Sequence, residues 1–368
     1  FDKVNDASAL AAEVNKVLQD ISKDKHLRFR FAPGFAQELQ ARAGEPDGAE
    51  PAPSPEELAW LQNNNYEFKE VKILPGNIGY IKFDGFLPHD GAKAAATAAL
   101  NFVANTNAVI FDMRENGGGD PVLVEWIMGY FYEKPTLINT FYNRIEDKTS
   151  ESYTVAEVKG PRLTGADVYI LTSSYTFSCA EEFSYDFQCL KRGKIVGEVT
   201  GGGAHPTQPF AVNDKFVLGI PFMRAINPVT KTNWEGVGIQ PDVRCSAAEA
   251  LKTAHVQALK DRAGRSDDAA AKADAEWEIT RLPLFYDKVE VKADLLQSYA
   301  GQYEDRTISF ENGKLFSQRP NGRKFELKPI SNTLFEIDET ARIEFFEGGK
   351  YVITHFKGEA DLKQLRAK

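Results

Sequence analysis

The sequence predicts an α/β core of parallel strands and helices, with a helical region before it and an antiparallel β module after it. Three observations lead to this prediction. Short apolar runs alternate with amphipathic helical segments between about residues 66 and 260. Two of these runs end in glycine-rich turns, at residues 117–119 and 201–203. Beyond residue 283, short alternating segments are separated by Asn-Gly and Gly-Gly pairs, a pattern typical of β-hairpins.

Composition narrows the class of protein. The chain has 368 residues, 42% of them hydrophobic, so we expect two or three domains with cores of their own. The formal net charge of −9 argues against a nucleic-acid partner. No run reaches the roughly 18 apolar residues that a membrane-spanning helix needs. The three cysteines, Cys179, Cys189 and Cys245, lack the spacing of zinc ligands. No Cys/His/Asp cluster has metal-ligand spacing, so we expect no bound metal.

The N-terminal region, residues 1–65, is predicted to be a helical cap. Residues 7–21 place their apolar side chains on one face of a helix, and an alternating pattern that begins near His26 indicates a strand. The segment 41–53 is rich in Pro, Gly and acidic residues, which indicates a loop or a poorly ordered stretch. Ser54 and Pro55 form a typical helix start.

The core, residues 66–260, is predicted from alternating strand and helix patterns. Strands are expected over 77–83, 109–112, 168–171 and 194–200, and helices over 89–104, 122–132 and 177–190. A hairpin or two strands over 208–225 and a turn-rich segment over 227–242 lead to a helix over 247–260. In parallel sheets, ligand sites form beyond the carboxyl ends of the strands, where the 117–119 turn and Ser178 are expected.

The remaining chain is predicted to contain a connector and a separate module. Residues 261–282 are charged and rich in alanine, which favours a helical connector. Residues 283–368 form the predicted antiparallel β module, with turns at Asn312-Gly313, Asn321-Gly322 and Gly348-Gly349.

Ser178 is the strongest candidate for chemistry. It lies where a predicted strand meets the first turn of a helix, beside free N–H groups and the positive end of that helix. This position suits a nucleophile, but serine is also a preferred N-cap residue, so both interpretations stay open on this stretch alone. Cys179 would point about 100° away from Ser178 on a helix, so the two cannot face one substrate. Glu181 and Glu182 are expected to interact favourably with the helix N-terminus.

Three stretches carry a family resemblance: FDMRENGGGD at 111–120, LTSSYTFSCAEEF at 171–183 and GEVTGGGAH at 197–205. In this order they resemble the family of C-terminal processing (tail-specific) peptidases, the tricorn core protease and interphotoreceptor retinoid-binding protein. The resemblance extends roughly from Lys16 to Gln257. It implies a crotonase/ClpP-like α/β core and a serine endopeptidase that hydrolyses peptide bonds through an acyl-enzyme without a cofactor.

The resemblance also implies a role for individual residues. Tail-specific members use a lysine as base, but glycine stands at or near Gly203, where that lysine would lie. The tricorn branch uses a histidine and a glutamate, and His26 and Glu235 occupy the matching places. Ser178 would be the nucleophile, His26 the general acid/base, and Glu235 the carboxylate that orients the imidazole. His205, just past the glycine turn, is an alternative base.

The same resemblance assigns the oxyanion hole to main-chain N–H groups of Gly118 or Gly119 and of Cys179. Tail-specific members often carry a PDZ module between the helical region and the core. Here only about 40 residues separate His26 from Tyr66, too few for such a module, so recognition of a free C-terminus is not predicted.

The expected partner is a peptide or unfolded protein substrate, and the sequence leaves open whether the chain forms a homo-oligomer. Relatives of this type are commonly exported from bacterial cells, which implies a periplasmic, cell-surface or secreted protein. The first residue, Phe1, is compatible with a removed export signal. Two other functions remain open. The retinoid-binding relatives suggest a non-catalytic carrier of hydrophobic ligands, and a non-peptide acyl hydrolase would share the same chemistry.

Overall fold

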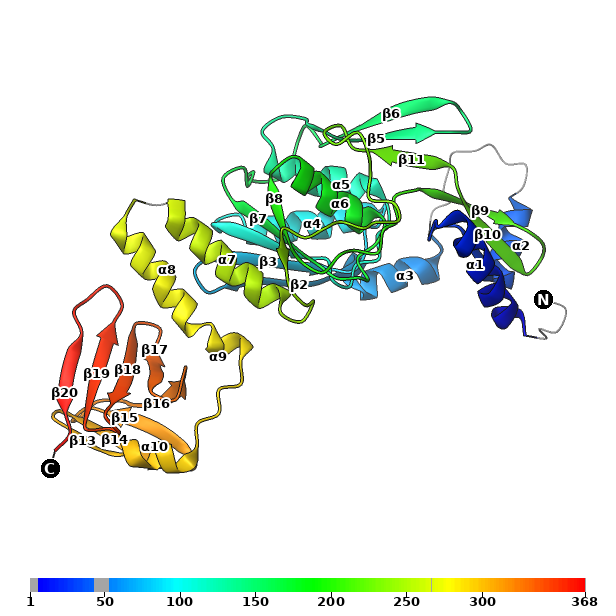
Figure 1. Ribbon diagram of the computed structural model, residues 1–368. Coiled ribbons are helices and arrows are strands. Elements are labelled where there is room, and N and C mark those ends of the chain that lie inside the picture. The colour runs from blue at the N-terminus through cyan, green and yellow to red at the C-terminus, as the bar shows by residue number, and fades with distance from the viewer. Residues whose placement is uncertain (1–5, 43–52, 266, 368) are drawn as a thin grey trace. The chain divides into compact units, whose positions relative to one another are not determined.

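The computed structural model describes residues 6–42, 53–265 and 267–367. The chain forms two compact units, which divide between Ala254 and His255, and each has a hydrophobic core of its own (Figure 1). Most of the loop predicted over 41–53 lies outside the described residues. Among the described helices, none is long and apolar enough to cross a membrane.

A mixed six-stranded sheet forms the centre of the first unit. Its strands are β2 (Phe68–Leu74), β3 (Ile78–Phe83), β4 (Ala108–Asp112), β7 (Asp167–Thr172), β8 (Gly193–Gly197) and β12 (Val243–Arg244). Their order is β12-β8-β7-β4-β3-β2. β2 pairs antiparallel with β3, and the other neighbours pair in parallel. The predicted α/β core is therefore confirmed.

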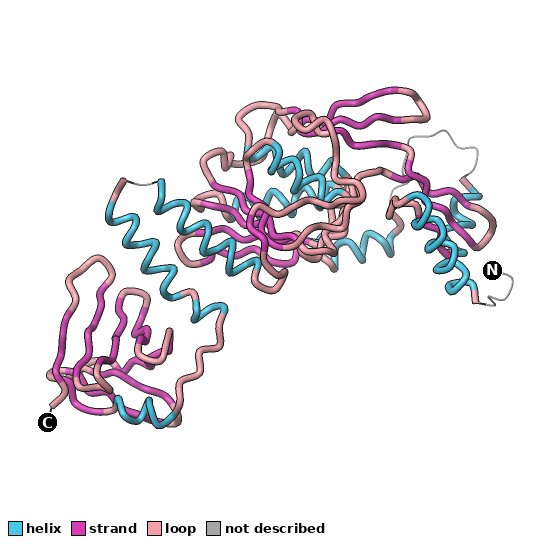
Figure 2. The backbone as a smooth tube through the Cα atoms, viewed as in Figure 1, coloured by secondary structure: helices cyan, strands magenta, loops and turns pink. Residues whose placement is uncertain are grey.

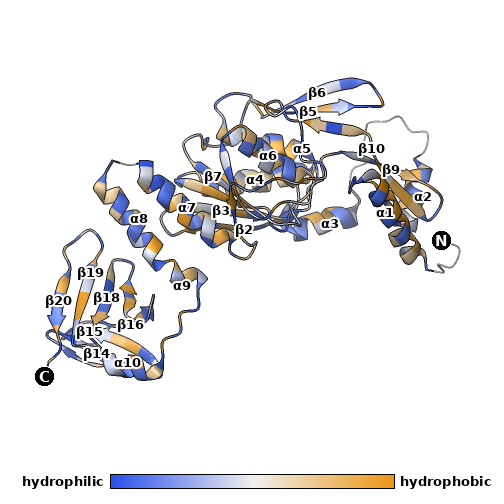
Figure 3. Cartoon of the chain, in the orientation of Figure 1, coloured by the Kyte–Doolittle hydropathy of each residue, from blue (hydrophilic) through white to orange (hydrophobic). Residues whose placement is uncertain are grey.

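The helices of the first unit are α1 (Ala7–Ser22), α2 (Pro33–Ala41), α3 (Pro55–Asn63), α4 (Asp90–Phe102), α5 (Pro121–Met128) and α6 (Cys179–Cys189), with short 3-10 turns over Asn65–Glu67 and Gly129–Phe131. α7 (Ala250–Arg265) runs across the division between the units. β4 is buried at every position and β7 at all but its first, which explains their nearly unbroken apolar sequences (Figure 3).

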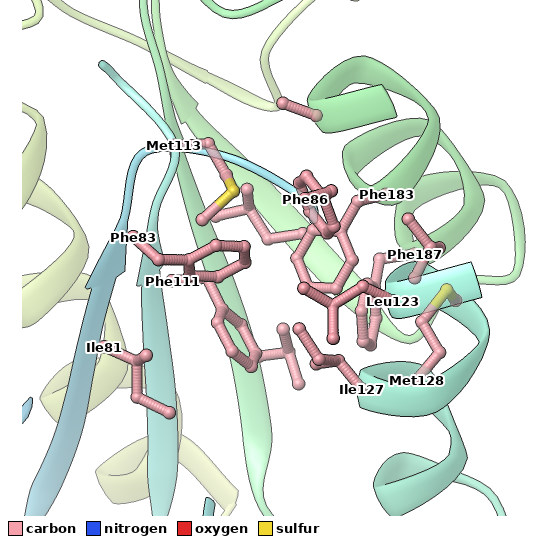
Figure 4. Close-up of a cluster of buried hydrophobic side chains, with 14 of the residues drawn as sticks. Ile81, Phe83, Phe86, Phe111, Met113, Leu123, Ile127, Met128, Phe183 and Phe187 are labelled. Carbon is pink, nitrogen blue, oxygen red and sulfur yellow. The ribbon is translucent and has the colours of Figure 1, made fainter. Parts of the chain in front are cut away.

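Aromatic packing fixes α6 against the sheet. Phe111 of β4 lies edge-on to Phe183 of α6, with ring centroids 5.1 Å apart, and Phe183 contacts Phe187 one turn later (Figure 4). Both helix rings are fully buried, and each such burial contributes about 1.5–3 kcal/mol. Because these contacts hold the helix in place, its N-terminus stays at the carboxyl edge of the sheet.

Two small antiparallel sheets flank the core. One has the order β1-β10-β9 and the other the order β11-β5-β6. The strands of the first are β1 (Arg28–Phe31), β9 (Thr207–Ala211) and β10 (Phe216–Pro221), and those of the second are β5 (Leu137–Asn143), β6 (Lys148–Tyr153) and β11 (Met223–Ile226). The β9–β10 hairpin matches the prediction over 208–225, whereas the β5–β6 hairpin was not predicted. Its turn has no glycine, and Asp147 supplies the positive φ of 52° instead.

The second unit confirms the predicted antiparallel β module. Its strands are β13 (Gly301–Tyr303), β14 (Arg306–Glu311), β15 (Lys314–Gln318), β16 (Lys324–Pro329), β17 (Leu334–Asp338), β18 (Ala341–Phe346), β19 (Tyr351–Phe356) and β20 (Leu362–Leu365) (Figure 2). They pair in sequence order, and a bridge between Tyr303 and Arg366 brings the two ends of the sheet together. The β14–β15 turn has positive φ at Asn312 and Gly313, as an Asn-Gly hairpin requires. Helices α8 (Ala269–Arg281), α9 (Pro283–Tyr286) and α10 (Ala293–Tyr299) precede the strands.

Candidate active site

Ser178 lies between β7 and α6 in a strained conformation, with φ 54° and ψ −122°. A non-glycine residue keeps such a backbone only where its surroundings hold it, and this pattern is common at functional sites. Its main-chain N–H donates to the carboxylate of Glu181 at 2.9 Å, and its carbonyl accepts from the N–H of Glu181 at 2.8 Å. The hydroxyl lies 3.1 Å from Nε2 of His26. The main chain of Ser178 thus caps the helix, which leaves the hydroxyl facing the imidazole.

His26 follows α1 and precedes β1. Because β1 pairs with β10, this segment is held beside the β9–β10 hairpin. The His26 ring packs against Phe177 at a centroid distance of 4.7 Å. Burial lowers the pKa of His26 to about 4, although the charge of Asp24 acts in the opposite direction. The imidazole is therefore neutral near pH 7, as a proton acceptor must be. Its Nδ1 is buried and has no hydrogen-bond partner among the described residues.

Glu235, the predicted orienting carboxylate, makes no hydrogen bond to His26 in the described part of the chain. Its Oε2 accepts from the N–H of Ala204 at 2.6 Å and lies 3.5 Å from Nδ1 of His205. Its Oε1 is buried without a partner among the described residues. Glu235 therefore contacts the imidazole of His205 and not that of His26.

His205, the alternative base, is held by Asp24. Nδ1 of His205 lies 2.7 Å from Oδ2 of Asp24, and this hydrogen bond raises the pKa of His205. The other oxygen of Asp24 accepts the main-chain N–H of His26 at 2.8 Å. The structure thus places His26, and not His205, in hydrogen-bond contact with Ser178. Asp24 was missed by the sequence analysis, although its position two residues before His26 is a local signal.

Asp24, His205 and Glu235 also form a group that could hold a metal ion. Each offers one ligand atom, and these atoms lie within 4.8 Å of one another. Two carboxylate oxygens and a histidine nitrogen suit a divalent transition metal. No metal was expected from the sequence, since these residues lie 30 to 211 positions apart along the chain and do not form a cluster with metal-ligand spacing.

The three predicted oxyanion donors differ in their contacts. The N–H of Gly118 donates to Oδ1 of Asn116 at 2.9 Å. The N–H groups of Gly119 and Cys179 donate no hydrogen bond within the described ranges, and both residues line the same cavity as Ser178. Asn116 was also missed. It is fully buried, and its side chain donates to the carbonyl of Phe83 at 2.9 Å, which fixes the glycine turn.

Gly118 is required for close approach. A Cβ at this position would lie 2.8 Å from Cβ of Ser178, and its φ of +104° disfavours any side chain. The glycine turn after β4 therefore packs directly against the N-terminus of α6.

Glu181 joins that N-terminus to the second glycine turn. Its carboxylate accepts from the N–H groups of Ser178, Gly202 and Gly203 and from the hydroxyl of Thr200. Burial raises the pKa of Glu181 to about 7, and these four donors oppose the rise. The predicted interaction of Glu181 with the helix N-terminus is present, and the same carboxylate also holds residues 202–203.

Two cavities meet at Ser178 and His26, and both residues line each of them. The first, of about 480 Å³, we call the aromatic cavity. Its side-chain walls include Phe141, Phe222, Met223, Trp234, Asp120 and Glu182. The second, of about 490 Å³, we call the basic cavity, because Lys25, Arg28 and Arg30 line it. A peptide bound across Ser178 would therefore have the apolar and acidic walls of the aromatic cavity on one side and the basic cavity on the other.

Comparison with known proteins gives a match to one family model, one similar curated protein and several similar solved structures. A family model described as Peptidase family S41 matches residues 77–245. The tricorn protease of Thermoplasma volcanium is 28% identical over 188 residues, a match that covers 50% of this chain and 16% of the tricorn protease. Among solved structures, the photosystem II D1 C-terminal processing protease has a TM-score of 0.40 and 19% identity over 48% of this chain and 45% of its own. A lipoprotein from Streptococcus agalactiae has a TM-score of 0.45 and 15% identity over 71% of this chain and 84% of its own.

Proposed function

Because residues 77–245 match the model of Peptidase family S41, we propose that this chain is a serine endopeptidase with Ser178 as nucleophile and His26 as general base. The observation that carries this proposal is the 3.1 Å contact between Oγ of Ser178 and Nε2 of a neutral, buried imidazole. A serine hydroxyl needs such a base within hydrogen-bond reach to become a useful nucleophile.

The proposed reaction has two halves. Oγ of Ser178 attacks the peptide carbonyl while Nε2 of His26 takes the hydroxyl proton, and the carbonyl oxygen becomes an oxyanion. The free N–H groups of Gly119 and Cys179 are the proposed donors to that oxyanion. His26 then gives the proton to the departing amine, which leaves an acyl-enzyme on Ser178. Water, deprotonated by His26, attacks the ester carbonyl, and His26 returns the proton to Oγ of Ser178 as the bond between Oγ and the acyl carbon breaks and the acid product leaves.

Asp24 and Glu235 are the proposed source of negative charge for the imidazolium that forms on His26. Asp24 bonds the main-chain N–H of His26, and its charge favours protonation of the ring. Glu235 acts through His205, which lies between the two carboxylates. In this arrangement Glu235 is a positioning residue, and Glu235→Gln should lower activity less than His26→Ala does.

Covalent labelling with a fluorophosphonate, read by intact mass, tests the assignment. We expect one adduct on the wild type, none on Ser178→Ala, and none on His26→Ala within the time that labels the wild type fully. His205→Ala should keep the label, because His205 bonds Asp24 and not Ser178. Loss of the adduct in His205→Ala with retention in His26→Ala would reverse the base assignment. A wild type without adduct would refute the proposed chemistry.

A non-catalytic ligand carrier is the second candidate, and the aromatic cavity of about 480 Å³ favours it. Trp234 lines that cavity, so an apolar ligand should change tryptophan fluorescence. Strong apolar binding without fluorophosphonate labelling would move this candidate ahead of the peptidase. Cleavage of an unfolded protein, compared with a simple ester, separates a peptidase from a non-peptide acyl hydrolase.

Export from the cell is part of the proposal, and cell fractionation tests it.

A further inference from the structure

If Gly119 and Cys179 are the oxyanion donors, the aromatic cavity receives the acyl side of the substrate at Ser178. Gly119 and Cys179, whose N–H groups donate to no group in the described part of the chain, line it together with Ser178. A carbonyl held against those two N–H groups places the side chain of its own residue beside them. We call this residue of a substrate the acyl-side residue. Its side chain would therefore enter the aromatic cavity.

The walls of this cavity combine two kinds of surface. Phe141 of β5, Met223 of β11 and Trp234 supply an apolar wall, whereas Glu182 of α6 and Asp120 supply carboxyl groups. Glu182 is 4% exposed, and its only hydrogen bond with another side chain in the described residues comes from Nδ2 of Asn139 at 3.1 Å. The cavity thus has apolar sides and a buried acid.

No cation among residues 6–42, 53–265 and 267–367 is paired with Glu182. The charged neighbours that act on Glu182 are Glu125 and Asp120, and Asp186 lies one helical turn further along α6. Asp186 is fully buried, and its Oδ2 has no hydrogen-bond partner among the described residues. Neither Glu182 nor Asp186 forms an ion pair in the described ranges. Carboxyl groups buried without a cation are costly, and a positive ligand group would relieve that cost.

We propose that the aromatic cavity selects lysine or arginine as the acyl-side residue of the substrate, and that Glu182 is the residue that determines this specificity. This inference rests on the proposed peptidase function. Lysine and arginine have apolar stems that would pack on Phe141, Met223 and Trp234. Their charged ends would reach the carboxylate of Glu182 and make charge-assisted hydrogen bonds.

The surroundings of Glu182 determine how the preference for a cationic acyl-side residue should depend on pH. Burial and the acids Glu125 and Asp120 raise its pKa to about 8, against the hydrogen bond from Asn139. Near pH 7 the group is mostly protonated in the free protein, so a cationic side chain must displace that proton. The preference for arginine over leucine should therefore grow as the pH rises from about 6.5 towards 8.5.

The test compares kcat/KM for three fluorogenic peptides that differ only in having Arg, Leu or Glu as the acyl-side residue. We expect the wild type to prefer Arg over Leu by about tenfold or more, since a buried charge pair gives strong discrimination. In Glu182→Gln, which keeps the shape of the side chain, this ratio should fall by about tenfold. Glu125→Gln is the matched control, because Glu125 contributes charge without lining the cavity, and its ratio should stay closer to that of the wild type.

A second measurement needs only the wild type. Benzamidine, an aromatic ring that carries a positive amidinium group, should slow fluorophosphonate labelling of Ser178. Its neutral analogue benzamide should not. This readout keeps the inference testable if Glu182→Gln fails to fold.

The outcomes separate the two proposals. A wild type that takes the label but prefers Leu, with no protection by benzamidine, would overturn the inference and leave the peptidase proposal standing. An unchanged Arg-to-Leu ratio in Glu182→Gln would overturn the role of Glu182. A wild type that neither takes the label nor cleaves any of the three peptides would refute the proposed function, and the inference with it.

Discussion

At the scale of single residues, the burial of His26 bears on its proposed role as the base. In that role the ring must be neutral to accept the proton of Ser178, and burial keeps it neutral down to a pH of about 4. Asp24 favours protonation, while the charges of His205 and Arg28 disfavour it. The base is thus available over a wider acidic range than an ordinary histidine would allow.

The first prediction concerns the acid limb of the pH profile. Because kcat/KM reports the base in the free enzyme, it should stay near its plateau at pH 5.5 and fall only as the pH drops towards about 4. Initial rates with the peptide that has Leu as its acyl-side residue measure kcat/KM at each pH. This peptide carries no cation for Glu182 to bind, so the titration of Glu182 does not enter the profile. Circular dichroism at each pH shows whether the fold persists. An acid limb near pH 6.5 would mean that the base is solvated.

The second prediction concerns Asn116. Asn116→Ala removes the hydrogen bonds to Gly118 and to the carbonyl of Phe83, so the glycine turn loses its support. The rate of fluorophosphonate labelling should fall by about tenfold or more, somewhat less than the loss of an oxyanion donor itself. Asn77→Ala is the control, because Asn77 is exposed and bonds only the distant Asn105 carbonyl through its side chain. A labelling rate equal to that of the control would remove Asn116 from the site.

At the scale of elements, a buried ionic group holds the end of β4. Asp112 accepts from the hydroxyl of Tyr80 at 2.7 Å and from Nε of Arg114 at 2.8 Å. Arg114 also donates to the carbonyl of Ala247 at 2.7 Å. This network fixes the strand end from which the first glycine turn starts.

The third prediction is that Asp112→Ala lowers the free energy of unfolding by about 3–5 kcal/mol, because it leaves Arg114 without its partner. Burial disfavours ionisation of Asp112, but the hydrogen bonds and charge of Arg114 hold its pKa below the usual range. Its stabilisation is therefore present above the unfolded pKa and is lost as the pH falls through the folded pKa. Urea denaturation at several pH values measures both the loss of unfolding free energy and its dependence on pH. Glu70→Ala, which breaks an exposed ion pair with Lys72, should cost under about 1 kcal/mol.

Local patterns in the sequence were enough to predict β4, β7 and α6, because their apolar spacing reflects burial within each element. The Asn312-Gly313 turn was predicted for a similar local reason. The β5–β6 hairpin was not, because its turn lacks glycine and β5 pairs with β11, about 80 residues later.

The candidate site shows the same limit. The contact between His26 and Ser178 spans 152 positions, and only the family resemblance linked the two residues. Asp24 is one of 53 acidic residues, and only its position two residues before His26 separates it from the others. The role of Glu235 stays a prediction, since its contacts run to Ala204 and His205.

At the scale of the whole molecule, the two units have separate cores. The first is built around Phe111 and Phe183, and the second around Tyr303, Phe335 and Phe345. Units with separate cores need not unfold together.

The fourth prediction is that calorimetry resolves two unfolding transitions. A fluorophosphonate adduct on Ser178 should raise the Tm of the transition of the first unit and leave the other in place, because the cavities at Ser178 are lined by residues of the first unit. Ser178→Ala treated in the same way is the control and should show no shift. A single transition whose calorimetric and van't Hoff enthalpies agree would show that the units unfold as one.

The meeting of β13 with the chain after β20 has a consequence for how this protein encounters other chains. The bridge between Tyr303 and Arg366, with the bond from Ala367 N–H to the carbonyl of Gln302 at 2.8 Å, occupies main-chain groups that an open sheet would leave unpaired. A sheet protected in this way resists stacking edge to edge with its copies. It also offers little to a peptide that binds by adding a strand. We therefore expect that a peptide captured through its main chain would bind the first unit, where β9 is an edge strand and Thr207 lines both cavities.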